Sequence, residues 1–439
     1  MLACEPRVES PYVPGIASPL GGTYARSQGA PRGLWVLCEG AQRVLEHEER
    51  LDWLLDDAEA MGVSDLFVQV YRGGRAWFDS ELADPAPYAK TWRSPRGDAL
   101  TTLIARAHDR GLRVHAWMNA LSLSGNSAAP VLTRLGRQAV IVDQHGRSVL
   151  DYPGFDVPPG DRDYYRIDTP AVWLDPAAPG VAGYLEDLVA ELLNRHPALD
   201  GIHLDYIRYP TALPFSPGTR FGVGLSFGHG ESVRARFQEE TGLRAPFRGS
   251  LINGNRFDEW RRDKLSELVA RVAGRARVTR PGVLVSAAVW AFADRAYLST
   301  FQDWRGWVAD GLIDLAVPML YTRDDRLFRY ASESFAGLRS APRIWVGVGA
   351  WLFAEEPERV GLQLSALARR PPLGQSLFSW DSIRENDALH RALTGAPPEE
   401  TEALPEESAE GDDPEEPTEG SAEAQREEPA DAAAEAESE

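Results

Sequence analysis

The segment Gly201-Ile-His-Leu-Asp-Tyr206, near the middle of the chain, has the pattern of a buried β-strand. Side chains alternate along a strand, so Ile202 and Leu204 share one face while His203 and Asp205 share the other. Seven further short apolar runs of this kind occur between Arg32 and Thr394. In chain order they are Leu34–Cys38, Leu66–Tyr71, Leu112–Met118, Val283–Val289, Ile313–Tyr321, Ile344–Val348 and Ser376–Trp380.

Amphipathic segments separate these runs. In Glu46–Met61 the apolar residues recur at helical spacing, and Gly62 follows as a helix stop. The same pattern occurs in Asp98–Arg110, Val181–Arg195, Phe257–Val278, Leu298–Asp310 and Glu355–Ala368. Eight β–α alternations predict an α/β protein with a (β/α)8, or TIM, barrel. A doubly wound open sheet is the alternative, but no G-x-G-x-x-G motif follows the first run.

Two connections are longer than a barrel requires. Ala120–Pro179 follows the third predicted strand, and Ile207–Asn255 follows the fourth and contains a predicted short helix at Glu231–Thr241. Long loops inside a compact domain are usually functional. Both follow strands, so we expect them on the C-terminal face, where barrel active sites form.

The charge of the chain is concentrated at one end. The formal net charge is −20, but residues 396–439 alone hold 18 Asp and Glu against one Arg. That segment has one large aliphatic residue, Leu404, and is predicted to be a disordered acidic tail. The sequence therefore divides into a tether at residues 1–30, a barrel domain at 31–395 and the tail. The acidic balance argues against binding to nucleic acid.

The two cysteines, Cys4 and Cys38, exclude a disulfide framework and a Cys-rich zinc site. No apolar run reaches the ~20 residues that a membrane span needs. Leu2-Ala3-Cys4 is similar to the end of a bacterial lipoprotein signal, which predicts a lipid anchor at Cys4 and a location in the cell envelope or outside the cell. An accidental tripeptide is the alternative, and it leaves a cytoplasmic location open.

Asp205 is the first candidate catalytic residue. It lies at the C-terminal end of the fourth predicted strand, where a carboxyl group can act as acid, base or nucleophile. An ion pair to Arg208 is the structural alternative. Asp381, Asp324 and Glu39 also fall at or just past predicted strand ends, so each is a candidate second carboxyl group. Asp175 is a weaker candidate, because its segment equally resembles a helix entry turn.

Polar and aromatic residues accompany these acids on the predicted strands. His115, Trp117 and Asn119 alternate onto one face of the third strand, and aromatic residues end several others. Such aromatic rings can stack on the apolar faces of sugars, although each one singly fits core packing equally well. The predicted substrate-binding residues are Arg72, His115, Trp117, Asn119, His203, Trp290, Tyr321 and Trp351.

Several chemistries lack their motifs. The chain has no G-x-S-x-G elbow, Walker loop or H-E-x-x-H sequence. His115, His203 and Asp205 are metal-ligand types, but they lack the usual closely spaced pair. We therefore expect neither a cofactor nor a metal.

The segments in order resemble the bacterial glycosyl-hydrolase-like TIM barrels that include glycosidases of peptide-stripped (denuded) peptidoglycan. The matching pieces are Arg32–Trp35, Val68–Arg72, Val114–Asn119, Trp173–Pro176, Asp200–Asp205, Trp260–Asp263 and Pro318–Tyr321. The resemblance implies a barrel that acts on glycan chains without a metal. The chain departs from the family pattern at three positions: Tyr206 replaces the second of two paired acids, Tyr71-Arg72 replaces Arg-Pro, and Met319 replaces Gln.

Three functions follow as hypotheses. The first is a glycoside hydrolase in which Asp205 and a second carboxyl group cleave a bacterial polysaccharide or cell-wall glycan. The second is a non-catalytic glycan-binding barrel of the envelope, which keeps the fold and the aromatic residues without the second acid. A third is a metal-dependent hydrolase such as a deacetylase.

Overall fold

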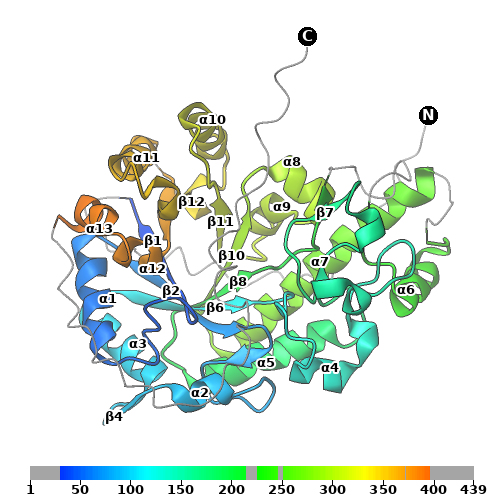
Figure 1. Ribbon diagram of the computed structural model, residues 1–439, viewed down its shortest axis with the longest axis horizontal. Helices are drawn as coiled ribbons and strands as arrows, with labels where there is room; N and C mark the ends of the chain where they lie inside the picture. Colours follow the sequence, from blue (N-terminus) through cyan, green and yellow to red (C-terminus); the bar gives the residue numbers. More distant parts are fainter. Residues whose placement is uncertain (1–29, 214–224, 246–250, 371, 396–439) are drawn as a thin grey trace, which may run out of the picture.

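Eight parallel strands close into a barrel in the computed structural model (Figure 1), which describes residues 30–213, 225–245, 251–370 and 372–395. Closure occurs at β1 (Arg32–Val36), which pairs with β2 (Asp65–Arg72) on one side and with β13 (Gly374–Phe378) on the other. The other barrel strands lie between them in chain order: β6 (Arg113–Asn119), β8 (Gly201–Asp205), β10 (Leu284–Trp290), β11 (Leu315–Met319) and β12 (Trp345–Gly349). The predicted TIM barrel is confirmed.

The predicted helices surround this barrel. They are α1 (Glu49–Ala60), α3 (Ala99–Asp109), α5 (Val181–Arg195), α7 (Leu251–Thr279), α9 (Trp304–Ala309) and α11 (Glu358–Ala368). Helix α9 begins later than the predicted Leu298, because a π-helical turn occupies Ala296–Thr300 and Asp303 then caps the helix by accepting from Gly306 N. The predicted short helix in the fourth loop is α6 (Glu231–Thr241).

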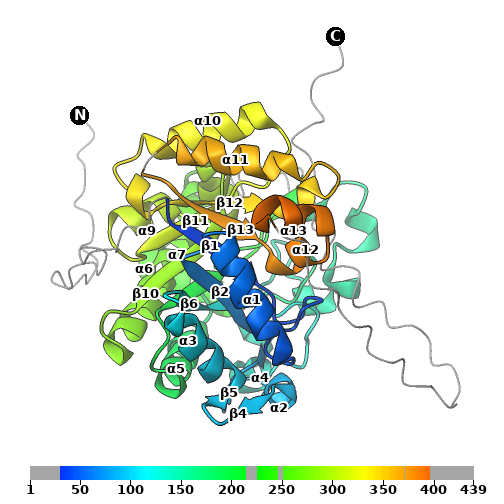
Figure 2. The same cartoon turned by 90° about the vertical axis from the view of Figure 1, so that its left-hand side faces the viewer.

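Among the described α-helices that follow β11, three were not predicted. They are α10 (Asp325–Ala336), α12 (Trp380–Arg384) and α13 (Asp387–Thr394). Helix α10 lies beside α11 in both views (Figures 1 and 2). Strand β13 ends at Phe378, since Ser379 accepts a hydrogen bond from Ser382 N and starts α12. The last predicted strand therefore extended two residues too far.

The long loops carry small elements of their own and contact one another. Strand β7 (Arg166–Ile167) of the first loop pairs antiparallel with β9 (Ala212–Leu213) of the second. Gln144 N also donates to Ser226 O at 2.9 Å. The first long loop also contains α4 (Pro130–Leu135). Other short elements lie outside the two long loops: β3 (Arg75–Ala76), α2 (Ala86–Lys90), β4 (Arg93–Ser94), β5 (Gly97–Asp98) and α8 (Ala293–Arg295). The loops after β6 and β8 thus form one joined structure.

The apolar core has two parts. The larger part lies between the strands and the helices, and the smaller part fills the barrel itself. Trp35, Phe67, Trp117 and Trp345 dominate the inner part, and all four are almost fully buried. Large side chains from several strands fill a barrel of this size, so its interior is a packed core rather than a channel.

Several predictions lie outside the described residues: the N-terminal tether, the lipid anchor at Cys4 and the acidic tail. Among the described residues, no helix is both long enough and apolar enough to span a membrane.

Candidate active site

Asp205 ends strand β8 at the C-terminal end of the barrel. Its side chain lies on the same face of β8 as that of His203, since side chains alternate along a strand. The His203 ring lies inside the barrel, with its centroid 4.3 Å from that of Phe67. Carboxylate Oδ2 accepts from Trp117 Nε1 at 3.1 Å, and Oδ1 accepts from Tyr206 N at 2.7 Å. The structure thus holds one carboxyl group at the position where barrel enzymes carry out their chemistry.

Tyr206, directly after Asp205, has a backbone φ of +49°. Residues other than glycine adopt this region rarely, and such strain gathers at functional sites. The left-handed turn ends the strand at Asp205 and brings the Tyr206 ring to 5.5 Å from the ring of Trp173 in the first long loop. The backbone itself therefore marks the Asp205–Tyr206 junction as a specialised point.

His203 lies below Asp205 and is fully buried. Its Nε2 accepts from Trp35 Nε1 at 3.0 Å, because an indole nitrogen can only donate. The ring proton is therefore on Nδ1, which donates to Ser286 Oγ at 2.8 Å. Burial, together with the neighbouring His115, holds the pKa of His203 well below its usual value. These contacts favour a neutral packing residue over the predicted contact with substrate.

His115 lies toward the opposite end of the barrel. Its Nε2 donates to Asp65 Oδ1 at 2.8 Å, and Asp65 is the first residue of β2. Arg113 NH2 and Ser64 Oγ donate to the other oxygen of Asp65 at 2.8 and 2.6 Å. This buried group joins β2 to β6 at the N-terminal end, so the placement favours a structural role for His115.

Asn119 takes part in a short polar chain near Asp205. It lies opposite Asp205 in the β6–β8 register, and its Oδ1 accepts from Gln69 Nε2 at 3.1 Å. Gln69 Oε1 in turn accepts from the Cys38 thiol at 3.0 Å. Gln69 and Asn119 are both almost fully buried. These hydrogen bonds therefore link the C-terminal ends of β2 and β6 to the segment that follows β1.

Aromatic rings flank the C-terminal end on the β11–β13 side. The Tyr321 ring lies 4.8 Å from the Trp351 ring and 5.8 Å from the Phe378 ring. The Phe378 ring also lies 6.2 Å from that of Trp117, which donates to Asp205. Tyr321, Trp351 and Phe378 are only half-buried, so they offer apolar ring surface next to the buried Trp117. The structure brings the predicted Trp117, Tyr321 and Trp351 together around one strand-end surface, with Phe378, which was not predicted, between them.

A second aromatic group lies on the β8–β10 side, around the Arg208 guanidinium. The guanidinium carbon lies 5.0 Å from the ring centroid of Trp173, 5.4 Å from that of Tyr206 and 5.3 Å from that of Trp290. Arg208 pairs with Asp168 of the first long loop at 2.7 Å. Among the described residues, Arg208 thus pairs with Asp168, whereas the structural alternative for Asp205 was an ion pair to Arg208.

The two other predicted catalytic acids are bound to backbone groups. Asp381 lies in the first turn of α12 rather than at a strand end, and accepts from Leu37 N at 3.1 Å and Gln42 N at 3.0 Å. Burial raises its pKa to about 6. Asp324 is the exposed N-cap of α10 and accepts from Arg326 N and Leu327 N, which lower its pKa. Both geometries favour positioning roles over catalysis.

Arg72 and Glu39 meet at the ends of β2 and β1. Arg72 Nε lies 3.4 Å from Glu39 Oε2, and Arg75 NH2 lies 2.9 Å from Glu39 Oε1. Sequence reasoning did not single out Arg75. Its signal was the Arg72-Gly-Gly-Arg75 segment, in which two glycines between short apolar runs predict a tight hairpin.

Asp175 is buried in a polar group beside the second loop. Its Oδ1 accepts from Tyr209 Oη at 3.2 Å and Ala177 N at 3.0 Å, whereas Oδ2 is buried without a hydrogen-bond partner among the described residues. Burial raises the pKa of Asp175 to about 6 despite these bonds. Tyr209 belongs to the segment that follows Asp205, so Asp175 helps to hold that segment.

We expect Asp175→Asn to change how stability depends on pH. A folded-state pKa near 6 exceeds the unfolded value of about 3.9, so the folded protein binds the extra proton between these values. The free energy of unfolding contributed by this group therefore falls as pH rises through that window, by on the order of 3 kcal/mol. Urea unfolding from pH 4 to pH 8 should show the variant gaining stability relative to the wild type. Parallel curves would contradict the assigned pKa.

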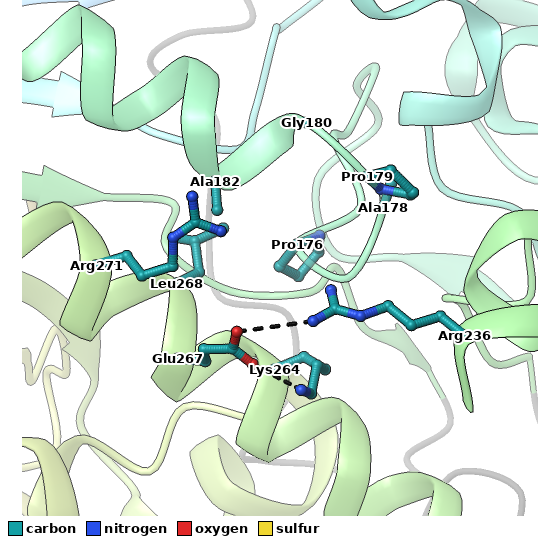
Figure 3. Close-up of a pocket in the computed structure, with 10 residues that line it drawn as sticks. All are labelled: Pro176, Ala178, Pro179, Gly180, Ala182, Arg236, Lys264, Glu267, Leu268 and Arg271. Carbon is teal, nitrogen blue, oxygen red and sulfur yellow. Dashed lines mark hydrogen bonds and ion pairs between the residues drawn. The ribbon is translucent and has the colours of Figure 1, made fainter. Parts of the chain in front are cut away.

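A pocket of about 230 Å³ lies away from these residues, between the start of α5 and helices α6 and α7 (Figure 3). Arg236, Lys264 and Arg271 enter it. Lys264 Nζ pairs with Glu267 at 2.6 Å, and Arg236 lies 3.7 Å from the same carboxylate. Glu240 pairs with both Arg236 and Lys264, and Arg271 pairs with Glu186. Three carboxylates thus balance the three cations, and the pocket carries no argument for a ligand. Over the described part of the chain, no group of three or more His, Cys, Asp or Glu could hold a metal ion.

The closed barrel of eight parallel strands makes the protein a TIM barrel. The catalytic domain of β-amylase from Paenibacillus polymyxa has a TM-score of 0.52 at 12% identity, covering 83% of this chain and 95% of that one. The β-galactosidase from Rahnella sp. R3 has a TM-score of 0.51 at 13% identity, covering 80% and 51%. At these identities the likeness concerns the fold.

The chain belongs to the glycosyl hydrolase-like 10 family, whose model matches residues 31–336. It is 24% identical over 415 residues to glycosyl hydrolase DigH of Escherichia coli (strain K12), covering 86% of both chains. Glycosyl hydrolase YngK of Bacillus subtilis (strain 168) is 23% identical over 295 residues, covering 63% of this chain and 50% of that one. The resemblance inferred from the sequence is thereby confirmed.

Proposed function

We propose that the protein is a glycoside hydrolase that cleaves a bacterial polysaccharide or cell-wall glycan, with Asp205 as one of its two carboxyl groups. The position of Asp205 carries this proposal. Its carboxylate lies at the C-terminal end of β8, is oriented by Trp117 and Tyr206, and is close to half-buried aromatic rings suited to sugars. Membership of a glycosyl-hydrolase-like family supports the same class of reaction.

The chemistry requires an acid that protonates the leaving oxygen and a second carboxylate that attacks the sugar or activates water. Among the described residues, Trp117 Nε1 and Tyr206 N each donate a hydrogen bond to the Asp205 carboxylate, one to each oxygen. These contacts suit the role of nucleophile or base better than that of acid. A separation of ~5–5.5 Å between the two groups would indicate retention, and ~6.5–9.5 Å inversion.

The binding barrel stays the second candidate function, and one observation favours it. Asp381 and Asp324, the other two predicted catalytic acids, both accept hydrogen bonds from backbone N–H groups and so serve the local fold. A barrel that lacks a second free carboxyl group would bind glycans without cleaving them.

The release of reducing ends from purified glycans tests the proposal. The panel should include peptide-free cell-wall glycan strands, polygalacturonate, chitin oligosaccharides and dextran, each incubated with the wild type and with Asp205→Asn. We expect release from at least one glycan by the wild type only. Binding without release by either protein would favour the binding barrel, and a loss of activity with chelator would favour the metal-dependent hydrolase.

A further inference from the structure

The hairpin between β2 and β3 places two arginines directly opposite one another. Arg72 pairs with Arg75 in the antiparallel register, and only Gly73 and Gly74 lie between them. Both glycines have positive φ, +61° and +74°, as a two-residue hairpin turn of this type requires. Like charges directly opposite on neighbouring strands are destabilising. The arrangement therefore calls for an explanation beyond hairpin stability.

Glu39 accounts for only part of this charge. Its carboxylate lies between the two guanidinium groups, at 3.4 Å from Arg72 Nε and 2.9 Å from Arg75 NH2, which leaves the trio with a net charge of +1. Arg72 Nε makes this ion-pair contact without hydrogen-bond geometry, and Arg75 Nε is buried without a hydrogen bond to the described residues. Two guanidinium groups thus share one carboxylate and retain unused donors.

The surrounding chain holds the trio in place. Asn126 Nδ2 donates to the Gly73 carbonyl at 2.7 Å, and a Cβ on Gly74 would lie 2.6 Å from Ala129 Cβ, so the hairpin turn packs tightly against the first long loop. On the other side, the bonds of Asp381 to Leu37 N and Gln42 N fix the segment that carries Glu39. A site that is already ordered loses little entropy on binding.

We propose that Arg72 and Arg75 form a subsite for a carboxylate-bearing sugar of the glycan, with Glu39 as the counter-ion that holds the two guanidinium groups ready. The planar guanidinium fork matches a carboxylate, and such charge-assisted pairs are among the strongest hydrogen bonds in proteins. The subsite lies on the β1–β2 side of the C-terminal end, and the Cys38–Gln69–Asn119 chain connects it to the register position of Asp205. This inference rests on the proposed glycan substrate.

Affinity electrophoresis tests the inference by comparing each glycan with its own neutral derivative. The parent protein is the full Asp205→Asn chain, so that turnover does not disturb binding. The probes are polygalacturonate and peptide-free cell-wall glycan strands, each with free carboxyl groups and with the same groups amidated, and dextran sulfate as a sulfated arm. We expect at least one free form to bind about tenfold or more tightly than its amidated form.

Arginine variants then test whether Arg72 and Arg75 cause the preference for the glycan with free carboxyl groups. Arg72→Met, Arg75→Met and the double variant should lose it, whereas Arg110→Met with Arg195→Met, which remove exposed ion pairs elsewhere, should keep it. The single variants keep the test decisive if the double variant does not fold. A preference that survives the Arg72 and Arg75 changes, equal binding of free and amidated glycans, or retention by dextran sulfate alone would overturn the inference.

The outcomes separate this inference from the proposed hydrolysis. Release of reducing ends by the wild type without any preference for carboxylated glycans would refute the subsite and leave the hydrolase intact. Arginine-dependent binding of a carboxylated glycan, with no release by the wild type, would refute the hydrolase and support the subsite.

Discussion

Asp205→Asn is expected to lower turnover of the true glycan by at least about a hundredfold and up to about 10⁴-fold, the range that one acid–base group contributes. The amide keeps the size of the carboxylate but can neither hold a negative charge at the reacting carbon nor accept a proton. The loss should appear in kcat, because the aromatic rings proposed to bind the sugar are unchanged. Initial rates of reducing-end release at saturating glycan measure it.

A matched control separates chemistry from folding. Trp117→Phe removes the indole donor to Asp205 Oδ2 but leaves the carboxyl group in place. It should lower activity much less than Asp205→Asn does, and should change the pH profile, because the carboxylate loses the indole donor. Both variants should unfold within a few degrees of the wild type. Equal activity of Asp205→Asn and the wild type would remove Asp205 as a catalytic residue.

The fold could be predicted because each barrel strand is a short apolar run, and Gly62, Gly111 and Gly311 end helices where the pattern breaks. Helix α10 was missed although its signals were present: Asp324 caps it, and Phe328, Ser332 and Phe335 form its buried face. The end of β13 could not be read, because Ser379 and Trp380 fit a strand as well as a helix start.

The candidate site shows where alternation along a strand stops being informative. Alternation placed His115, Trp117 and Asn119 on one face of β6, as their inward contacts bear out. Alternation did not reveal that residues on one face have different partners at the two ends of the barrel. His115 contacts Asp65 near the N-terminal end, whereas Trp117, two residues further along β6, contacts Asp205 at the C-terminal end. Partners that come from distant parts of the chain, such as Leu37 after β1 for Asp381, depend on the closure of the barrel, which local sequence does not encode.

The N-terminal end of the barrel should matter for stability as Asp205 does for activity. We expect Asp65→Ala to lower the free energy of unfolding by about 3–5 kcal/mol, the usual cost of removing one partner from a buried ion pair. Asp65 is fully buried and binds His115, Arg113 and Ser64, which together join β2 to β6. Urea unfolding at pH 7 measures the loss, and Asp56→Ala, which removes an exposed partner of Arg110, should stay within about 0.5 kcal/mol of the wild type.

The pH dependence of that loss identifies its cause. Burial by itself would raise the pKa of Asp65, but the hydrogen bond from His115 and the charges of His115 and Arg113 outweigh it and leave the pKa below its ordinary value. A lowered folded-state pKa contributes stability above the unfolded value of about 3.9, and that contribution is lost as pH falls through the folded value. The gap between wild type and Asp65→Ala should therefore narrow below about pH 4. A gap that stays constant down to acid unfolding would mean that Asp65 acts through packing alone, whereas a narrowing gap assigns the stability to the charge of a carboxylate placed at the end of the barrel opposite Asp205.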